Sequence, residues 1–236
     1  MNAVASNMAL AYAIACAAVC GASWLAAWVQ MPMRGLWIAI GSAWVLVGAW
    51  LLRAGVAAWR TVPRWLALLG GLLALWAAWL AVFQARVMGV NFLFSVLALV
   101  WVADIVAYFC GRALGGRFFS NKLAPSISPG KTWEGAFGGV LGVVACAWIW
   151  RWIDGVATVD SPSLYSHVGG MGGLTLTVAA VFMAAMSIVG DLVESLFKRS
   201  AGVKDSSGLL PGHGGVLDRV DALLPTLPIA MMLVSI

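Results

Sequence analysis

The chain has 236 residues, of which 63% are hydrophobic and only 10% charged, and its mean hydropathy is +0.97. Soluble domains carry about 25% charged residues, so the composition excludes a water-soluble globule, and it also excludes a disordered chain. The formal net charge is +5. In a chain this apolar, such an excess is typical of basic cytoplasmic loops. We therefore expect a lipid bilayer around the protein and no nucleic-acid partner.

Apolar runs in chain order predict seven membrane spans, since a span needs about 20 apolar residues. They cover residues 8–29, 36–52, 65–83, 90–110, 136–153, 173–190 and 220–236. The first run is too long for a signal peptide and lacks a basic segment before it, which favours a retained helix. The last run carries Pro225 and Pro228, which predicts a kink. The expected fold is an all-α, polytopic transmembrane protein with about seven spans.

Basic residues are concentrated in every second loop, and this alternation predicts the orientation. The rich loops are 53–64, 111–135 and 191–219, and the positive-inside rule places them in the cytoplasm. The N-terminus would then lie inside and residue 236 outside. The expected location is a bacterial inner membrane.

Polar residues are distributed unevenly, which predicts two parts. Residues 1–90 would be N-terminal transmembrane helices without a chemical motif. Residues 91–236 would form a catalytic transmembrane region with cytoplasmic loops 111–135 and 191–219. The four cysteines stand in apolar runs without a CxxC spacing, so we expect packing residues and neither a disulfide nor a zinc site.

The first polar cluster runs from Asp104 to Glu134. Asp104 stands inside an apolar run, and a carboxylate in a membrane span is a functional-site hypothesis by default. The alternative is a structural ion pair with Arg112 or Arg117. Downstream, the segment SPGKTWEG at 128–135 predicts a turn at Pro129-Gly130, followed by a helix. Lysine and hydroxyls before a helix N-terminus suit phosphate oxygens, and the candidates are Ser128, Lys131, Thr132 and Glu134.

The second polar cluster covers residues 190–221. If the preceding helix continues, one of its faces carries Asp191, Glu194, Ser195 and Lys198. Two further carboxylates, Asp218 and Asp221, are three residues apart and would share a face of the last helix. Between the two carboxylate pairs lies the segment PGHGG at 211–215, whose glycines allow a ligand to approach the backbone closely.

These residue types together predict phosphoryl or nucleotidyl transfer. Several oxygen ligands favour Mg²⁺ over zinc, and neighbouring Lys and Arg side chains suit phosphate. Such reactions depend mainly on metal and cations that neutralise the phosphates and hold them in line. The alternative is a charged loop that only orients the protein in the membrane.

At these residues the chain resembles the phosphatidate cytidylyltransferase family, the CDP-diacylglycerol synthases. Residues 195–221 meet every fixed position of that family's signature, namely Ser195, Lys198, Arg199, Lys204, Asp205, Ser207, Leu210, Pro211, His213, Gly214, Gly215, Asp218, Arg219 and Asp221. The upstream segment resembles the family as well, with Asp104, Ala107, Tyr108 and Gly111 followed by SPGKTWEG. The resemblance covers roughly residues 100–230.

The resemblance implies the formation of CDP-diacylglycerol and pyrophosphate from CTP and phosphatidate, with Mg²⁺ as cofactor and the active site facing the cytoplasm. It implies Asp191 and Asp218 as metal carboxylates, with Asp221 in support. It implies phosphate contacts from Lys198, Arg199, Lys204 and Arg219, joined by Lys131 and Ser128. His213 would contact phosphate or order its loop, in preference to acting as a general base. The remaining expected site residues are Asp205, Asp104, Thr132, Glu134, Ser195, Gly214 and Gly215.

Two other functions stay open at this point. A CTP-dependent membrane lipid kinase would use similar residues but would release CDP and a phosphorylated lipid alcohol. An ion-coupled transporter would also place carboxylates in spans, but it would normally show two related halves, and no internal repeat is visible. The oligomeric state stays open too, a homodimer included.

Overall fold

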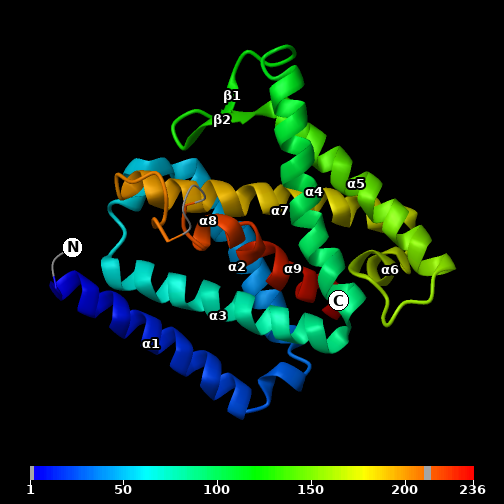
Figure 1. The fold of residues 1–236 in the computed structure, drawn as a ribbon, viewed down its shortest axis with the longest axis horizontal. Helices are drawn as coiled ribbons and strands as arrows, with labels where there is room; N and C mark the ends of the chain where they lie inside the picture. Colours follow the sequence, from blue (N-terminus) through cyan, green and yellow to red (C-terminus); the bar gives the residue numbers. More distant parts are fainter. Residues whose placement is uncertain (1–2, 210–213) are drawn as a thin grey trace.

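The computed structural model describes residues 3–209 and 214–236, and the described chain is almost entirely helical (Figure 1). In chain order the elements are α1 (Ala3–Leu25), the short η1 (Trp28–Gln30), α2 (Arg34–Trp59), α3 (Arg64–Met88), α4 (Val90–Leu114), β1 (Lys122–Ala124), β2 (Ser128–Thr132), α5 (Trp133–Val156), α6 (Leu164–Gly169), α7 (Gly173–Ser200), α8 (Leu217–Val220) and α9 (Leu223–Ser235).

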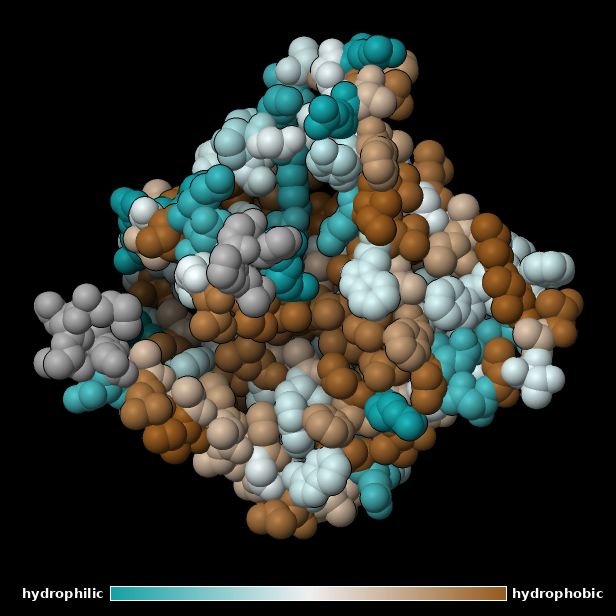
Figure 2. Space-filling view, in the orientation of Figure 1, coloured by the Kyte–Doolittle hydropathy of each residue, from teal (hydrophilic) through white to brown (hydrophobic). Residues whose placement is uncertain are grey.

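Within the described ranges, six helices are long and apolar enough to cross a membrane: α1, α2, α3, α4, α5 and α7. This confirms an all-α, multi-pass membrane protein and the first six predicted spans. Figure 2 shows hydrophobic surface over α1 and α3, whereas hydrophilic residues gather toward the β-strands and the end of α7.

The predicted seventh span is not among these six helices. Residues 220–236 contain the end of α8 and then α9, which has 13 residues and is therefore about 20 Å long. That is shorter than the roughly 30 Å hydrocarbon core of a bilayer. Residues 225–231 are buried, and α9 packs against α2, α3 and α7. This apolar run forms a helix that packs within the protein. Composition alone does not distinguish such a helix from a membrane span.

One apolar core joins the helices that precede residue 90 to those that follow it. It includes Trp37 of α2, Leu80 of α3, Leu99 of α4 and Met183 of α7. The indole of Trp37 donates to Oε1 of Gln84 at 2.9 Å, and the amide of Gln84 donates to the backbone oxygens at 28 and 31. Through these hydrogen bonds, Gln84 fixes α3 to η1 and to the start of α2.

Helices α4 and α5 form the most extensive helix pair (Figure 1). Glycines allow their backbones to approach: a Cβ placed on Gly139 would lie 2.9 Å from the backbone oxygen of Ala103. Small residues commonly permit such close packing between membrane helices. The pair carries the β-strands at one end and contacts α6 near the other.

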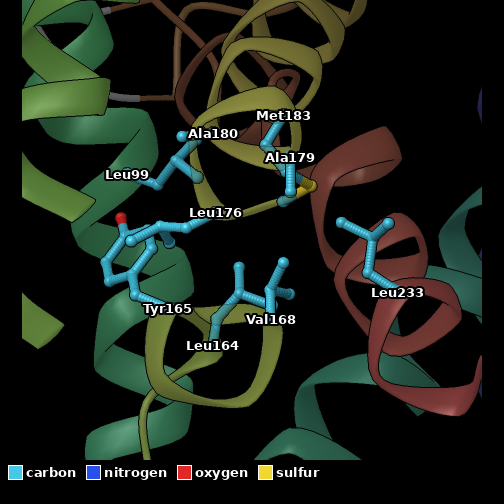
Figure 3. A pocket seen from close by; sticks show the side chains of 9 residues that line it. All are labelled: Leu99, Leu164, Tyr165, Val168, Leu176, Ala179, Ala180, Met183 and Leu233. Atoms are coloured by element: carbon cyan, nitrogen blue, oxygen red, sulfur yellow. The ribbon is translucent and has the colours of Figure 1, made fainter. Parts of the chain in front are cut away.

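The loop from α5 to α7 is fastened to the start of α4. The carboxylate of Asp160 accepts hydrogen bonds from the backbone N–H groups of Val90 at 2.6 Å and Asn91 at 3.0 Å. Nearby, α4, α6, α7 and α9 enclose an entirely apolar cavity of about 10 Å³, lined by Leu99, Tyr165, Met183 and their neighbours (Figure 3). That volume is about one water-sized sphere and offers no polar partner, so we assign no ligand to this cavity.

The two strands form a small antiparallel hairpin between α4 and α5, with Lys122 opposite Thr132 and Ala124 opposite Ser128. The turn lies at residues 125–127, so the predicted turn at Pro129-Gly130 is wrong. Those two residues lie within β2. A proline is tolerated in this position because both strands of a two-stranded sheet are edge strands. Every second backbone N–H of an edge strand points away from the other strand and needs no partner there.

We predict that the hairpin and the chain after α7 share one side of the membrane, with the loop 157–163 on the other. In a variant lacking the four native cysteines, a cysteine replacing exposed Val203 should resist an impermeant thiol reagent added outside intact cells. A cysteine replacing exposed Thr158 should react. Labelling at position 203 from outside would contradict this orientation.

Candidate active site

A pocket of about 490 Å³ lies between α4, α5, α7 and the hairpin. Its lining is mixed. Polar side chains come from Asp104, Tyr108, Arg112, Lys131, Thr132 and Asp191, and apolar ones include Ala103, Ala107, Ala136, Ala184 and Ile188. Such a pocket can receive a ligand with charged and hydrocarbon parts.

An ion pair connects the hairpin to α7 across this pocket. Nζ of Lys131 lies 2.5 Å from Oδ2 of Asp191, and the two side chains are 26% and 31% exposed. Lys131 is near the end of β2, and Asp191 lies on the face of α7 that also carries Ser195. The hydroxyl of Ser195 donates to Oδ1 of Asp191 at 3.4 Å. Both charged groups line the pocket. A phosphate could therefore replace Asp191 beside Lys131, and a cation could replace Lys131 beside Asp191.

Two more carboxylates lie within electrostatic range of Asp191. Asp104 of α4 lines the same pocket, and Asp221 lies between α8 and α9. Burial raises the pKa of Asp221 to about 7, and the negative charges of Asp191, Glu194 and Asp104 contribute to the increase. These carboxylates therefore bring several negative charges close together, and a bound cation would reduce their mutual repulsion.

The structure does not bear out the alternative role for Asp104. Asp191 is paired with Lys131, and Glu194 and Asp218 are paired with Lys198, but no ion pair among the described residues includes Asp104. Asp104 therefore forms no ion pair with Arg112 or Arg117. A carboxylate without a salt-bridge partner that faces a pocket inside a span keeps its functional interpretation.

A second cluster lies one helical turn further along α7. Nζ of Lys198 lies 2.5 Å from Oε2 of Glu194 and 2.6 Å from Oδ1 of Asp218. Glu194 is 4% exposed, Lys198 17% and Asp218 11%. The predicted shared face of α7 is confirmed, since the helix continues to Ser200 and brings these groups together.

Asp218 also organises the loop that precedes it. Its Oδ2 accepts from the backbone N–H and hydroxyl of Ser206 at 2.9 and 2.8 Å, and from the backbone N–H of Gly215 at 2.7 Å. Burial acts to raise the pKa of Asp218, but Lys198 and these hydrogen bonds hold it well below its usual range. The carboxylate thus stays ionised and ties the end of α7 to α8.

The segment between β2 and α5 is fixed by its own side chains. The hydroxyl of Thr132 accepts from the N–H of Gly135 at 3.1 Å and so caps α5. Oε1 of Glu134 accepts three backbone N–H groups, from Gly116, Phe118 and Phe119, at 3.0 to 3.1 Å. Glu134 therefore shapes the loop after α4 and does not face the pocket.

A small apolar cluster packs the hairpin and α7 against the end of α2, next to the site. Buried Ile127, Leu192 and Leu196 pack with side chains at the end of α2, which has a non-helical kink at Gly55. There the ring of Trp59 lies 4.3 Å from that of Phe197. Nε of Arg199 donates to the backbone oxygen of Ile127 at 3.3 Å, so Arg199 holds the hairpin turn against α7.

The sequence profile of the cytidylyltransferase family matches residues 1–236. The chain belongs to the cytidylyltransferase family. Several curated relatives carry the name phosphatidate cytidylyltransferase. The relative from Haemophilus influenzae is 47% identical over 140 residues, covering 59% of this chain and 44% of the relative. That from Pseudomonas aeruginosa is 41% identical over 168 residues (70% and 56%), and that from Bacillus subtilis 38% over 148 residues (63% and 49%). The chain spans about half the length of the curated relatives it matches.

The other expected residues of the family signature have varied surroundings. Lys204 and Asp205 are exposed in the loop after α7, and Ser128 begins β2. Gly214 has a left-handed φ of 78°, which favours glycine, and Gly215 contacts Asp218. Arg219 lies in α8. His213 falls outside the described residues.

The pocket contains two residues to which the sequence analysis gave no site role, Tyr108 and Arg112. Both were visible in the sequence: Tyr108 belongs to the family-like segment, and Arg112 stood as a basic loop residue and as a possible ion-pair partner of Asp104. Their spacing of four from each other, and of four and eight from Asp104, indicated one helix face. Only the packing of α4 shows that this face borders the pocket.

The donor set fits Mg²⁺ in its chemistry. Among the described residues, no three His, Cys, Asp or Glu side chains converge on a single metal position. Magnesium is usually bound by one or two carboxylates and completes its octahedron with water and substrate phosphates. Asp191 beside the pocket, with Asp221 and Asp104 near it, supplies carboxylate oxygens of that kind.

We predict different roles for the two lysines. Lys198→Met leaves buried Glu194 without its cation and should lower the free energy of unfolding by about 3 kcal/mol. Lys131→Met removes half of a partly exposed pair and should cost about 1 kcal/mol or less. Thermal unfolding of the purified proteins in one detergent compares the two. Equal losses would contradict this division between a structural and a functional lysine.

A second prediction concerns pH. The pKa of Asp221 in the folded protein, about 7, exceeds its ordinary value of 3.8. The protonated form therefore stabilises the fold, and that stability is lost as the pH rises through about 7. With divalent metal chelated, the melting temperature of the wild type should decrease between about pH 5 and about pH 8. Asp221→Asn should flatten this decrease, and an unchanged slope would exclude Asp221 as its source.

Proposed function

We propose that the chain catalyses the transfer of a cytidylyl group from CTP to phosphatidate, giving CDP-diacylglycerol and pyrophosphate. The observation that carries the proposal is the Lys131–Asp191 pair in the lining of a pocket that combines charged and apolar side chains. The names of the relatives and the complete family signature at 195–221 support the same activity.

In the proposed reaction, a phosphatidate oxygen attacks the α-phosphorus of CTP, and the bond from that phosphorus to the pyrophosphate oxygen breaks. Lys131 would leave Asp191 to contact a nucleotide phosphate oxygen, where its positive charge offsets charge that develops during transfer. No proton need be removed from an ionised phosphate monoester. The protein's task is therefore mainly to align two phosphates.

Magnesium would bind to Asp191, with Asp221 in support. When bound, it would neutralise nucleotide phosphates and assist departure of pyrophosphate. The resemblance also assigns Asp218 to the metal. Since Asp218 already accepts four donors, we propose that it chiefly holds the loop around Gly215 and Ser206 in place.

Orientation follows from the substrate. CTP is a cytoplasmic nucleotide, and the basic loops on the hairpin side obey the positive-inside pattern. We propose a bacterial inner-membrane enzyme whose pocket opens toward the cytoplasm.

The decisive experiment is a product assay. Purified protein with CTP labelled at the α-phosphate, phosphatidate and Mg²⁺ should place label in the lipid fraction as CDP-diacylglycerol. Label released as CDP, together with a phosphorylated lipid alcohol when that alcohol replaces phosphatidate, would identify a lipid kinase instead.

We predict that chelation abolishes the label in lipid and that added Mg²⁺ restores it. Asp191→Asn should reduce turnover by at least about a hundredfold, a loss of about 2.7 kcal/mol of transition-state stabilisation. Asp160→Asn, at the opposite end of the molecule, is the matched control and should retain turnover. Comparable losses in both variants would point to general instability.

A further inference from the structure

Arg112 is a pocket cation without an acidic partner. It lines the pocket together with Asp104 and Tyr108, spaced four residues apart on one face of α4. Its Nη1 donates to the hydroxyl of Tyr108 at 3.1 Å, whereas Lys131 is occupied by Asp191. Within residues 3–209 and 214–236, the guanidinium of Arg112 forms no ion pair. Most of its donors are therefore available to a ligand.

The surroundings of Arg112 indicate where that ligand comes from. Arg112 lies in the last turns of α4, a membrane-spanning helix. The adjoining face of α4 carries Ile105 and Phe109, which are 55% and 63% exposed and so face lipid. An arginine at the end of a span extends to the depth of the lipid headgroups. Arg112 therefore stands at the border between the pocket and the bilayer.

We propose that Arg112, oriented by Tyr108, forms the subsite for the phosphate monoester of the lipid substrate. This rests on the proposed function. It adds that Arg112 binds the phosphate of the lipid, whereas Lys131 binds a phosphate of the nucleotide. A guanidinium presents paired N–H groups that match two oxygens of one phosphate. Lys131 lies on the hairpin, outside the membrane-spanning helices, and in the proposed function it contacts the nucleotide.

The test compares Arg112→Gln with Arg117→Gln. Both remove one positive charge near the end of α4, but Arg117 does not line the pocket. It therefore controls for general attraction of anionic lipid. Thermal stabilisation of the purified protein in detergent, without CTP, should be titrated with dioctanoyl phosphatidate. Inorganic phosphate and dioctanoyl phosphatidylglycerol, a phosphodiester, form the other two arms.

We expect phosphatidate to stabilise the wild type and Arg117→Gln at similar concentrations. Arg112→Gln should require about tenfold more lipid, the usual order for one lost charged hydrogen bond. Arg112→Lys should recover only part of that loss. In the enzymatic assay, Arg112→Gln should raise the KM for phosphatidate about tenfold while the KM for CTP stays unchanged.

Three results would overturn the assignment. Equal weakening in Arg112→Gln and Arg117→Gln would indicate a general charge effect. Equal stabilisation by inorganic phosphate would indicate a site for a free anion and not for the lipid. An unchanged titration in Arg112→Gln would remove the residue from the site altogether. Selective binding that depends on Arg112, in a protein that makes no CDP-diacylglycerol, would support the subsite while refuting the proposed function.

Discussion

The arrangement of the pocket depends on one interaction, the ion pair between Lys131 and Asp191 at 2.5 Å. Lys131 lies on a hairpin that connects α4 to α5, and Asp191 lies on α7, so the pair joins segments 60 residues apart in the chain. Its side chains are about a quarter to a third exposed, and pairs of that kind contribute little to stability. The pair instead contributes to the geometry of the site, because it places both charges in the lining of one pocket.

Around this pair, the polar groups divide into a rigid part and an exchangeable part. Lys198, Glu194 and Asp218 form a largely buried cluster that fixes the loop after α7. Glu134 and Thr132 fix the start of α5 in the same way. Lys131 and Arg112 are anchored less tightly and face the pocket. Preorganised groups that surround adaptable charges are what alignment of two phosphates requires.

Sequence patterns predicted the first six spans from the lengths of apolar runs and the shared face of α7 from helical spacing. They did not predict that residues 223–235 form a core helix, since a short apolar run looks the same whether lipid or protein covers it. The Pro129-Gly130 turn was wrong because pairing between strands overrode a local preference. Arg112 was missed because its importance arises from how α4 packs beside the hairpin. The roles of the metal carboxylates stay predictions.

The most direct test of this account is a double-mutant cycle on Lys131→Met and Asp191→Asn, followed by both turnover and thermal unfolding. If the pair acts as one catalytic unit, the double variant should turn over hardly more slowly than the worse single variant, and all three should melt close to the wild type. Losses that multiply in turnover, or a melting temperature that falls in step with activity, would contradict the central role of this ion pair.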